Sequence, residues 1–245
     1  RLYASTYGRG LWVSPVYCHY VDTPLVVNQT VTWSRDTTLD RSVTITSGDT
    51  LEIAGCRVNL PTEAKIVVQR GATLILDGAV LSGSCNDLWW GGEVWGNPKT
   101  MQASNDQGKI ILKNGAVIEQ SLKAIFCGKG IENVYPNYDY TGGIGDARDA
   151  VFRNNEMGIQ LWTYPYSSAS VIRNCRFLTN QLLAGGSTPE YFITLAQVKD
   201  VVIESCRFEY LVEGEPDYKK HGRGIYAIDA GFEVRPYQAG DSAGF

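Results

Sequence analysis

A short motif recurs along this chain at intervals of 20 to 23 residues or multiples of them, and this recurrence constrains the fold more than any other feature. Residues 45–51 and 68–74 both read apolar-x-x-Gly-x-Thr-Leu and lie 23 positions apart. The pattern returns over residues 112–118, 44 positions after Val68, which is two periods of 22. A repeat of this length is typical of architectures in which each unit stacks on the next and so buries an apolar face that it cannot bury alone.

The second half of the chain carries a related motif with more variable spacing. Residues 152–157 align with residues 172–177 at an offset of 20, and residues 203–208 follow at an offset of 31. We attribute the longer interval to an insertion near residues 185–190, whose Gly, Ser, Thr and Pro are typical of loops. This alignment predicts that six apolar residues stack along one wall of the molecule, and these are Ile45, Val68, Leu112, Phe152, Ile172 and Ile203.

The segments between the motifs predict strands. Short runs rich in Val, Ile and Leu, such as residues 65–68 and 109–112, are bounded by Gly, Asn and Asp. No amphipathic helical pattern extends beyond two turns. Gly71 and Asn174 suit corners between strands, because both residue types tolerate a positive φ. Short strands joined by tight turns predict an all-β solenoid, and we expect a parallel β-helix over residues 39–245, incomplete at its C-terminal end.

Part of this region also resembles a known family. Residues 64–78 (AKIVVQRGATLILDG), 81–85 (LSGSC) and 89–96 (WWGGEVWG) are similar to right-handed parallel β-helix domains of large secreted proteins from Bacteroidetes-type bacteria. In that family the last element usually reads W-x-G-I-x-V-x-G, and Gly92 stands here in place of the Ile. The resemblance implies export by the type IX secretion system, whose signal is a C-terminal domain that this sequence does not contain.

The first residues lie outside the repeat. Residues 2–13 read as a strand, a Gly-rich turn and a second strand, and residues 15–38 read as a linker with two prolines. The stretch LYASTYGRGLWV resembles the closing strands of sialidase-type (Asp-box) β-propellers. We therefore expect residues 1–14 to be the end of a preceding propeller, and the whole chain to be part of a longer secreted or surface-anchored protein.

Charge and hydropathy exclude two classes of function. The net charge is -4, without the basic stripe expected of a protein that binds nucleic acid generally. No apolar stretch approaches the roughly 18 residues needed to span a bilayer. We expect no nucleic-acid partner and no membrane span, and a location that is secreted or on the outer cell surface.

The six cysteines are spread along the chain, and none forms a C-x-x-C pair. An even number fits a secreted protein with some disulfides. Cys56 and Cys85 flank the two best-matched strands and are the predicted disulfide. Cys175 and Cys206 occupy matching motif positions, so we expect them on adjacent coils with parallel side-chain directions, a geometry that favours free thiols.

Acidic residues offer one candidate metal site. Asp146 and Asp149 follow the Gly-rich residues 142–145, and carboxylates so placed suit calcium. The alternative, which we favour, is a solvated loop. No Asp-Asp pair or Gly-His-Gly motif of a pectin hydrolase occurs, and the chain contains only two histidines. We expect no catalytic residues and no cofactor, apart from calcium if this pair binds it.

Two further sets of residues are candidates for ligand binding. Arg153 and Arg173 hold matching motif positions, where one coil of separation suits an anion, unless Glu204 neutralises the ladder. Trp90 and Trp95 are candidates for a platform on which sugar rings stack. In a regular strand Trp90 points away from the face of its neighbouring tryptophans, so at least one indole of the cluster is expected inside the solenoid.

These features favour a non-catalytic structural or adhesive module of a large secreted or cell-surface protein. Glycans or other surface proteins are the expected partners, together with the secretion machinery through the missing domain. Two alternatives stay open. One is a polysaccharide lyase or glycoside hydrolase, because enzymes of these kinds occur on β-helices although a fold does not determine function. The other is a carbohydrate-binding module that uses the tryptophan face.

Overall fold

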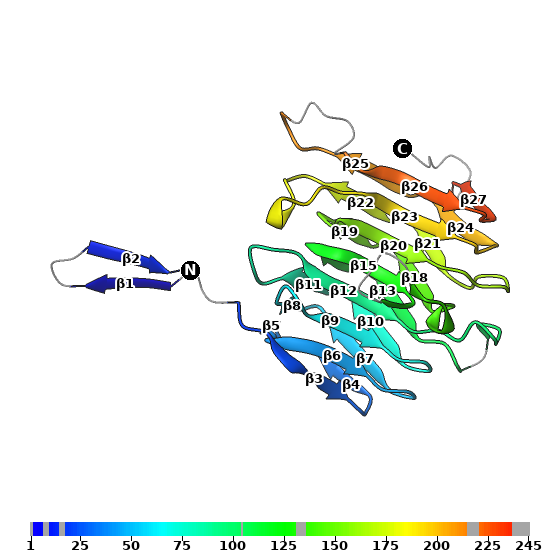
Figure 1. The fold of residues 1–245 in the computed structure, drawn as a ribbon, viewed down its shortest axis with the longest axis horizontal. Helices are drawn as coiled ribbons and strands as arrows, with labels where there is room; N and C mark the ends of the chain where they lie inside the picture. Colours follow the sequence, from blue (N-terminus) through cyan, green and yellow to red (C-terminus); the bar gives the residue numbers. More distant parts are fainter. Residues whose placement is uncertain are drawn as a thin grey trace.

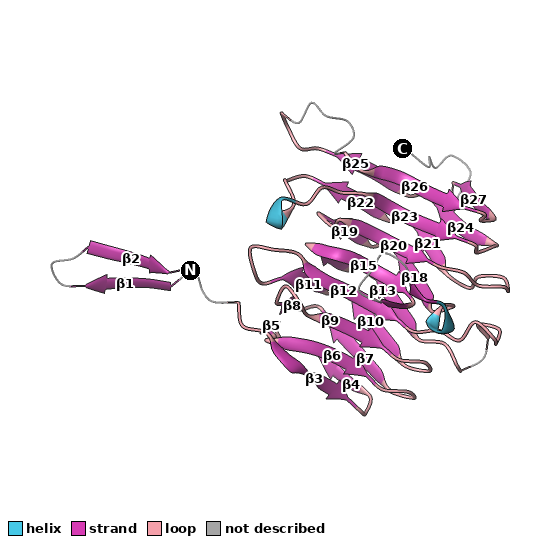
Figure 2. Ribbon diagram, in the orientation of Figure 1, coloured by secondary structure: helices cyan, strands magenta, loops and turns pink. Residues whose placement is uncertain are grey.

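The computed structural model describes residues 2–6, 10–14, 18–103, 105–130, 136–214 and 221–236. This part of the chain is almost entirely β-structure (Figure 2), with two single-turn 3₁₀ helices, η1 (Tyr138–Tyr140) and η2 (Ala184–Gly186). None of the helices in the described part is long and apolar enough to cross a membrane. The all-β class predicted from the repeat is confirmed.

Most strands belong to three long sheets in which all neighbouring strands run parallel. Sheet 1 contains β3 (Val21–Val27), β6 (Arg41–Ile45), β9 (Lys65–Val68), β12 (Trp89–Val94), β15 (Ser121–Cys127), β20 (Met157–Leu161), β23 (Tyr191–Ala196) and β26 (Arg223–Ile228). Sheet 2 contains β4 (Val31–Trp33), β7 (Thr50–Ala54), β10 (Thr73–Asp77), β13 (Lys109–Lys113), β18 (Ile144–Arg148), β21 (Val171–Arg173), β24 (Val201–Glu204) and β27 (Phe232–Arg235). Sheet 3 contains β5 (Thr37–Thr38), β8 (Arg57–Leu60), β11 (Val80–Gly83), β14 (Val117–Glu119), β19 (Val151–Arg153), β22 (Arg176–Thr179) and β25 (Arg207–Tyr210).

The chain visits sheets 1, 2 and 3 in turn and then begins the next coil, so each strand pairs with the strand one coil away in the same sheet. Figure 1 shows the coils stacked from the blue strands β3–β5 to the orange and red strands β25–β27. This is the topology of a parallel β-helix. Its backbone hydrogen bonds run from coil to coil, which satisfies the polar groups of a chain that has almost no helix.

The interior is built from side chains that alternate along each strand. Leu51, Leu74 and Ile110 are in register on consecutive coils of sheet 2, and all three are fully buried. In sheet 3 the ring of Phe177 stacks on Phe152 at 4.8 Å and on Phe208 at 5.1 Å between centroids. Burying each such side chain contributes about 1.5–3 kcal/mol, so the stacked core drives closure of the coils.

The predicted wall of six residues is wrong. Phe152 pairs with Phe177 in sheet 3, whereas Ile172 pairs with Ile203 in sheet 2, and Ile45 belongs to sheet 1. The cause is that corners after different sheets look alike in sequence. Asn154 follows a sheet 3 strand and Asn174 follows a sheet 2 strand, yet both adopt a positive φ, of 55° and 49°. The motif therefore marks a corner without identifying which one.

The number of residues in a coil also varies, because several of the connections before and after the strands of sheet 1 are long. Residues 95–108, 128–143 and 162–170 join sheet 1 to sheet 2, and residues 84–88, 180–190 and 211–222 join sheet 3 to sheet 1. From the second coil onward, the links between sheets 2 and 3 have at most three residues. The outer face of sheet 1 is thus bordered on both sides by inserted loops. One insertion contains the short antiparallel pair β16 (Lys129–Gly130) and β17 (Pro136–Asn137).

The N-terminal region differs from the prediction at one point. Strands β1 (Leu2–Thr6) and β2 (Gly10–Ser14) pair antiparallel, as a strand, turn and strand would, although most of the turn lies outside the described residues. Residues 15–38, predicted as a linker, contain β3, β4 and β5, which pair with the second coil. Sequence reasoning misses this first coil because its strands are mostly exposed, β4 and β5 are short, and the longer β3 contains Pro24.

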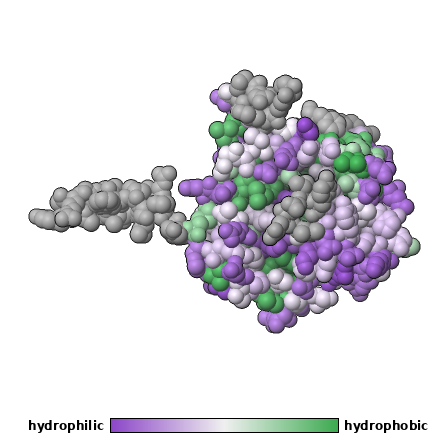
Figure 3. All heavy atoms as spheres, in the orientation of Figure 1, coloured by the Kyte–Doolittle hydropathy of each residue, from purple (hydrophilic) through white to green (hydrophobic). Residues whose placement is uncertain are grey.

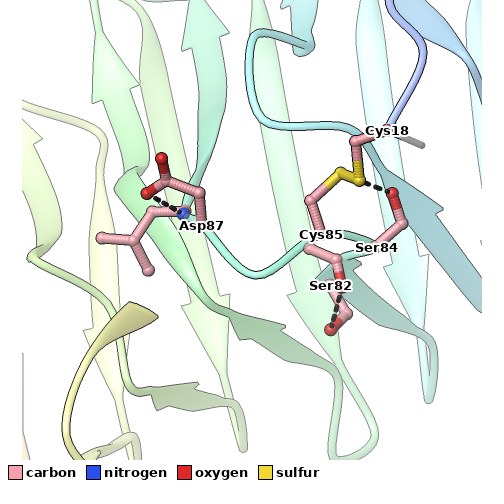
Figure 4. The surroundings of a disulfide bond; sticks show 7 residues. Cys18, Ser82, Ser84, Cys85 and Asp87 are labelled. Carbon is pink, nitrogen blue, oxygen red and sulfur yellow. Dashed lines mark hydrogen bonds between the residues drawn. A yellow bond between two sulfur atoms is a disulfide. The ribbon is translucent and has the colours of Figure 1, made fainter. Parts of the chain in front are cut away.

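A disulfide joins the beginning of this first coil to the third. Cys18 and Cys85 are bonded, with their Cα atoms 5.9 Å apart, and Figure 4 shows the bond beside Ser84. The predicted Cys56–Cys85 disulfide is wrong, because Cys56 is buried and its thiol donates to the Trp33 carbonyl at 3.5 Å. Cys85 instead lies in the inserted loop at residues 84–88, on the edge of the coil.

The free thiols predicted at Cys175 and Cys206 are confirmed. Both residues are buried and unbonded, and they occupy matching corners of consecutive coils. Each thiol donates to main-chain carbonyls, Cys175 to Arg173 and Cys206 to Glu204, both at 3.3 Å. These cysteines therefore act as small buried side chains of the core.

The molecular surface carries some exposed hydrophobic residues. On the face drawn in Figure 3, they form small separate groups.

Candidate functional site

The outer face of sheet 1 is shaped by a β-bulge where β12 meets β15. The register shifts between Gly91 and Gly92, so that Gly91 pairs with Lys65 on one side and Lys123 on the other. Gly91 has a φ of 114°, and a Cβ there would lie 1.7 Å from the Lys123 carbonyl oxygen. Only glycine fits, and the two lysines flank it on the outward face.

A buried carboxylate organises this face. Glu93 in β12 is fully buried, and its Oε1 accepts a hydrogen bond from the Lys65 ammonium at 2.9 Å. Trp95 Nε1 donates to Oε2 at 2.9 Å, and the Gly130 amide donates to Oε1 at 3.3 Å. Three donors offset the desolvation of the charge, and they come from β9, from the residue after β12 and from β16.

Trp90 lies at the centre of one group of cations and rings. The Lys65 ammonium is 5.3 Å from the Trp90 ring centroid, and the Lys123 ammonium is 5.4 Å from it. Lys123 also lies 4.6 Å from the Phe126 ring, which meets Trp90 edge-on at 5.8 Å. Phe126 packs with Trp162 and Ala196 into a small buried cluster that is separate from the main core. This second cluster anchors Trp90 on the outside of sheet 1.

A second group lies beyond the end of β12. The rings of Trp95 and Tyr140 meet edge-on at 5.1 Å, and the Lys129 ammonium is 4.7 Å from the first and 4.8 Å from the second. The Arg70 guanidinium lies 4.6 Å from the Tyr140 ring and donates to the Gly96 carbonyl at 2.8 Å. We call both groups together the aromatic–cation surface, which consists of Lys65, Arg70, Trp90, Trp95, Lys123, Lys129 and Tyr140.

The electrostatics of this face affect two ionisable groups in particular. Burial lowers the pKa of the Lys123 ammonium, although the carboxylates of Glu93, Glu156 and Glu190 oppose the shift. Burial raises the pKa of Glu156, which a hydrogen bond from Ser187 partly offsets. Both pKa shifts favour the neutral forms of these groups. A neutral lysine amine can accept a proton, and a neutral carboxyl group can donate one.

The structure brings Trp90 and Trp95 onto one surface, as the stacking-platform prediction requires. Both are partly exposed, and the bulge makes the shared orientation possible. The expectation that one indole fills the interior is also met, since Trp89 is fully buried and donates to the Glu119 carbonyl at 2.8 Å.

The two predicted anion-binding arginines do not form a pair. Arg153 ends a sheet 3 strand and donates to Glu119 at 2.7 Å, whereas Arg173 ends a sheet 2 strand and forms an ion pair with Glu204. Their apparent equivalence came from the same corner ambiguity as the wrong wall. Each arginine is engaged by a carboxylate on the neighbouring coil.

The predicted calcium ligands already have partners. Asp146 accepts from Arg148 Nε at 2.7 Å, and Asp149, at a corner with a φ of 52°, accepts from Asn174 at 2.6 Å. Over the described ranges, no group of three or more His, Cys, Asp or Glu side chains is placed to hold a metal ion. The pair therefore receives no further acidic or histidine ligand from the part of the chain that the structure covers.

Sequence reasoning missed the four cations of the surface. Lys65 and Lys123 each lie on a strand, but the burial patterns of β9 and β15 do not alternate regularly, so the outward direction of these two side chains could not be inferred from the sequence. Lys129 and Tyr140 come from an inserted loop that no periodicity predicts, and Arg70 follows the end of a strand.

No protein-family model matches the chain, and no curated protein matches it. The fold and the site therefore define its class, an all-β protein of parallel β-helix topology with an aromatic–cation surface on one sheet.

Proposed function

We propose that the chain is a non-catalytic structural and adhesive module of a large secreted or cell-surface protein. The observation that carries this proposal is the continuity of the fold. Sheets 1 and 2 run through eight coils and sheet 3 through seven, with parallel pairing at every step. Since each coil contacts mainly its neighbours, such a stack forms a rigid element of fixed length, suited to holding a binding face away from its attachment.

The disulfide supports an extracellular location. Cys18 and Cys85 close a separation of 67 residues, and such bonds persist mainly in oxidising compartments. The resemblance to secreted β-helix domains of Bacteroidetes-type bacteria supports the same location. On this basis the chain is exported by the type IX system and follows a β-propeller in the longer protein. The proposed β-helix winds in the right-handed sense, because crossovers between parallel strands are right-handed in nearly all proteins.

The inserted loops support the adhesive part of the proposal. They gather at the two edges of sheet 1, while the links between sheets 2 and 3 stay short from the second coil onward. Binding residues are commonly carried on loops that a rigid scaffold positions, and here these loops border the face that carries the aromatic–cation surface.

The purified chain is to be incubated with pectins, alginates and glycosaminoglycans, with and without calcium. Ultraviolet absorbance would report unsaturated uronate, and a reducing-end assay would report hydrolysis. We expect no product above the rate without protein. Product formation with any of these polymers would overturn the non-catalytic proposal.

A lyase or glycoside hydrolase is the second candidate, and one observation favours it. Lys123 has a lowered pKa and Glu156 a raised one, which suits a base and an acid. In the same assay, turnover that is lost in Lys123→Met but kept in Lys109→Met, a lysine of sheet 2, would establish this candidate.

A further inference from the structure

We infer that the aromatic–cation surface binds acidic polysaccharides, with carboxylate or sulfate groups held by its cations and sugar rings packed on its aromatic side chains. This inference rests on the proposed adhesive function and names its ligand class. It concerns the outer face of sheet 1 over the third to fifth coils, together with Lys129, Gly130 and Tyr140 from the described parts of the connection that follows β15.

Three cations of the surface have no direct carboxylate partner in the described part of the chain. Glu93 is fully buried and forms its ion pair with Lys65. Within the described ranges, the ammonium groups of Lys123 and Lys129 form cation–ring contacts and no ion pair. Arg70 donates to the carbonyls of Gly96 and Asp139 and to no carboxylate group in the same ranges. Three cations can therefore contact a ligand directly, although the carboxylates of Glu156 and Glu190 also act on Lys123 and reduce the local positive charge. Cations placed in this way attract anions even on a chain whose net charge is -4.

The rings distinguish a saccharide from a simple anion. Trp90, Trp95 and Tyr140 are all partly exposed on this face. The C–H face of a pyranose packs well on a flat indole or phenol ring, which buries apolar area while the ring substituents stay in reach of polar groups. A cation beside each ring, such as Lys129 between Trp95 and Tyr140, then meets the acidic substituent of the same sugar.

The surface is held in place before any ligand arrives. Glu93 connects Lys65, Trp95 and Gly130 through hydrogen bonds of 2.9 to 3.3 Å. Gly130 approaches Trp90 so closely that a Cβ would lie 2.7 Å from the indole. Two coils of a β-helix stand about 4.8 Å apart, so a polymer that crosses several coils contacts both groups of the surface at once. Preorganisation of this kind reduces the entropy lost on binding.

Binding is to be measured by calorimetry at low salt with four polymers. Polygalacturonate carries carboxylates on sugars, dextran sulfate carries sulfates on sugars, dextran is neutral, and poly-L-glutamate carries carboxylates without sugar. We expect polygalacturonate or dextran sulfate to bind at least about tenfold more tightly than dextran or poly-L-glutamate. Affinity should fall as salt rises, because the cations are partly exposed.

Variants locate the site. Lys123→Met and Lys129→Met should each weaken binding by about tenfold, whereas Lys109→Met on sheet 2 should not change it. Tyr140→Leu should weaken binding and Tyr140→Phe should preserve it, because only the latter keeps the flat ring. Circular dichroism confirms that each variant is folded.

Equal affinity for poly-L-glutamate, or equal losses in Lys109→Met and Lys123→Met, would overturn the inference by showing general attraction of polyanions. Absence of binding to all four polymers, with no product in the cleavage assay, would overturn this ligand class and leave the structural function standing. Product formation would overturn the non-catalytic function, even where binding follows the expected order.

Discussion

The Lys65 ammonium lies 2.9 Å from the Glu93 carboxylate, although the two residues are 28 positions apart in the chain and belong to neighbouring coils. The carboxylate is fully buried while the lysine is about one-third exposed, so the pair fixes the inner end of a partly exposed surface. This contact links the stability of the fold to the shape of the candidate site.

Replacing Glu93 by Gln should therefore destabilise the protein by about 1–3 kcal/mol, because Lys65 and Trp95 lose a charged acceptor that they share. Urea denaturation followed by tryptophan fluorescence measures the change. Lys113 and Asp77 supply a matched control, since they also join neighbouring coils at 2.9 Å but lie on the exposed side of sheet 2. Asp77→Asn should change stability less, and an equal effect of both variants would show that burial of Glu93 is not decisive.

Loss of the disulfide should lower the free energy of unfolding, because the unfolded chain gains conformational entropy when the crosslink is absent. Cys18 and Cys85 are separated by 67 residues, and a crosslink that closes a loop of this order contributes about 2–4 kcal/mol. Cys18→Ser should thus lower the urea midpoint, and a reducing agent should lower the wild-type midpoint to a similar value. Peptide mapping without reduction should link Cys18 to Cys85. A link from Cys85 to Cys56 would contradict the assignment.

Acid should weaken the ladder of ion pairs around Glu119. Its carboxylate is buried, which alone would raise its pKa, but hydrogen bonds from Arg153 and Arg57 lower the pKa below the ordinary value of 4.5. A carboxyl group whose pKa is lower in the folded state stabilises the fold above its unfolded pKa, and this contribution is lost as pH falls through the folded pKa. Stability should therefore decline below about pH 4.5.

Glu119→Gln tests this assignment. The variant should be less stable at neutral pH, and its stability should depend less on pH in the acidic range than that of the wild type. Urea titrations at a series of pH values measure both effects. An unchanged acidic slope in Glu119→Gln would assign the acid sensitivity to other carboxylates, such as Glu204 with its Arg173 and Arg235 partners.

The fold class was predictable because the strands and corners each have a local signature. Alternation of apolar residues marks a strand such as Thr50–Ala54, and a Gly or Asn after a strand marks a corner, where it adopts a positive φ. The register was not predictable from the same signals. Asn154 and Asn174 satisfy one motif at corners of different sheets, and the choice between them depends on which rings and aliphatic chains stack in three dimensions.

The candidate site was predictable only for Trp90 and Trp95. Placing both on one face required the bulge at Gly91, which depends on pairing with Lys123, 32 residues further along the chain. The carboxylate between them and the cations around them come from four separate segments of the chain. Their proximity follows from coil stacking and from a loop at residues 128–143 whose path the repeat does not specify.

Lys123 should titrate below the ordinary lysine value of 10.5, because burial penalises its charged form. The carboxylate of Glu156 partly offsets this penalty by favouring the ammonium. Glu156→Gln should therefore lower the pKa of Lys123 further, and nuclear magnetic resonance of lysine Cε groups, assigned with Lys123→Arg, measures both values. A base whose pKa is lower in the folded state binds fewer protons there, so its charged form opposes folding in full below the folded pKa, and the penalty is lost as pH rises from the folded to the unfolded pKa. Lys123→Met, which keeps an apolar stem against Trp90 and Phe126, should accordingly leave neutral-pH stability equal to or above that of the wild type.

A pKa of Lys123 at or above 10.5, or a clear loss of stability in Lys123→Met, would contradict this prediction. Either result would show that favourable charge contacts hold Lys123, so that the cation stabilises the fold and is not available to a ligand.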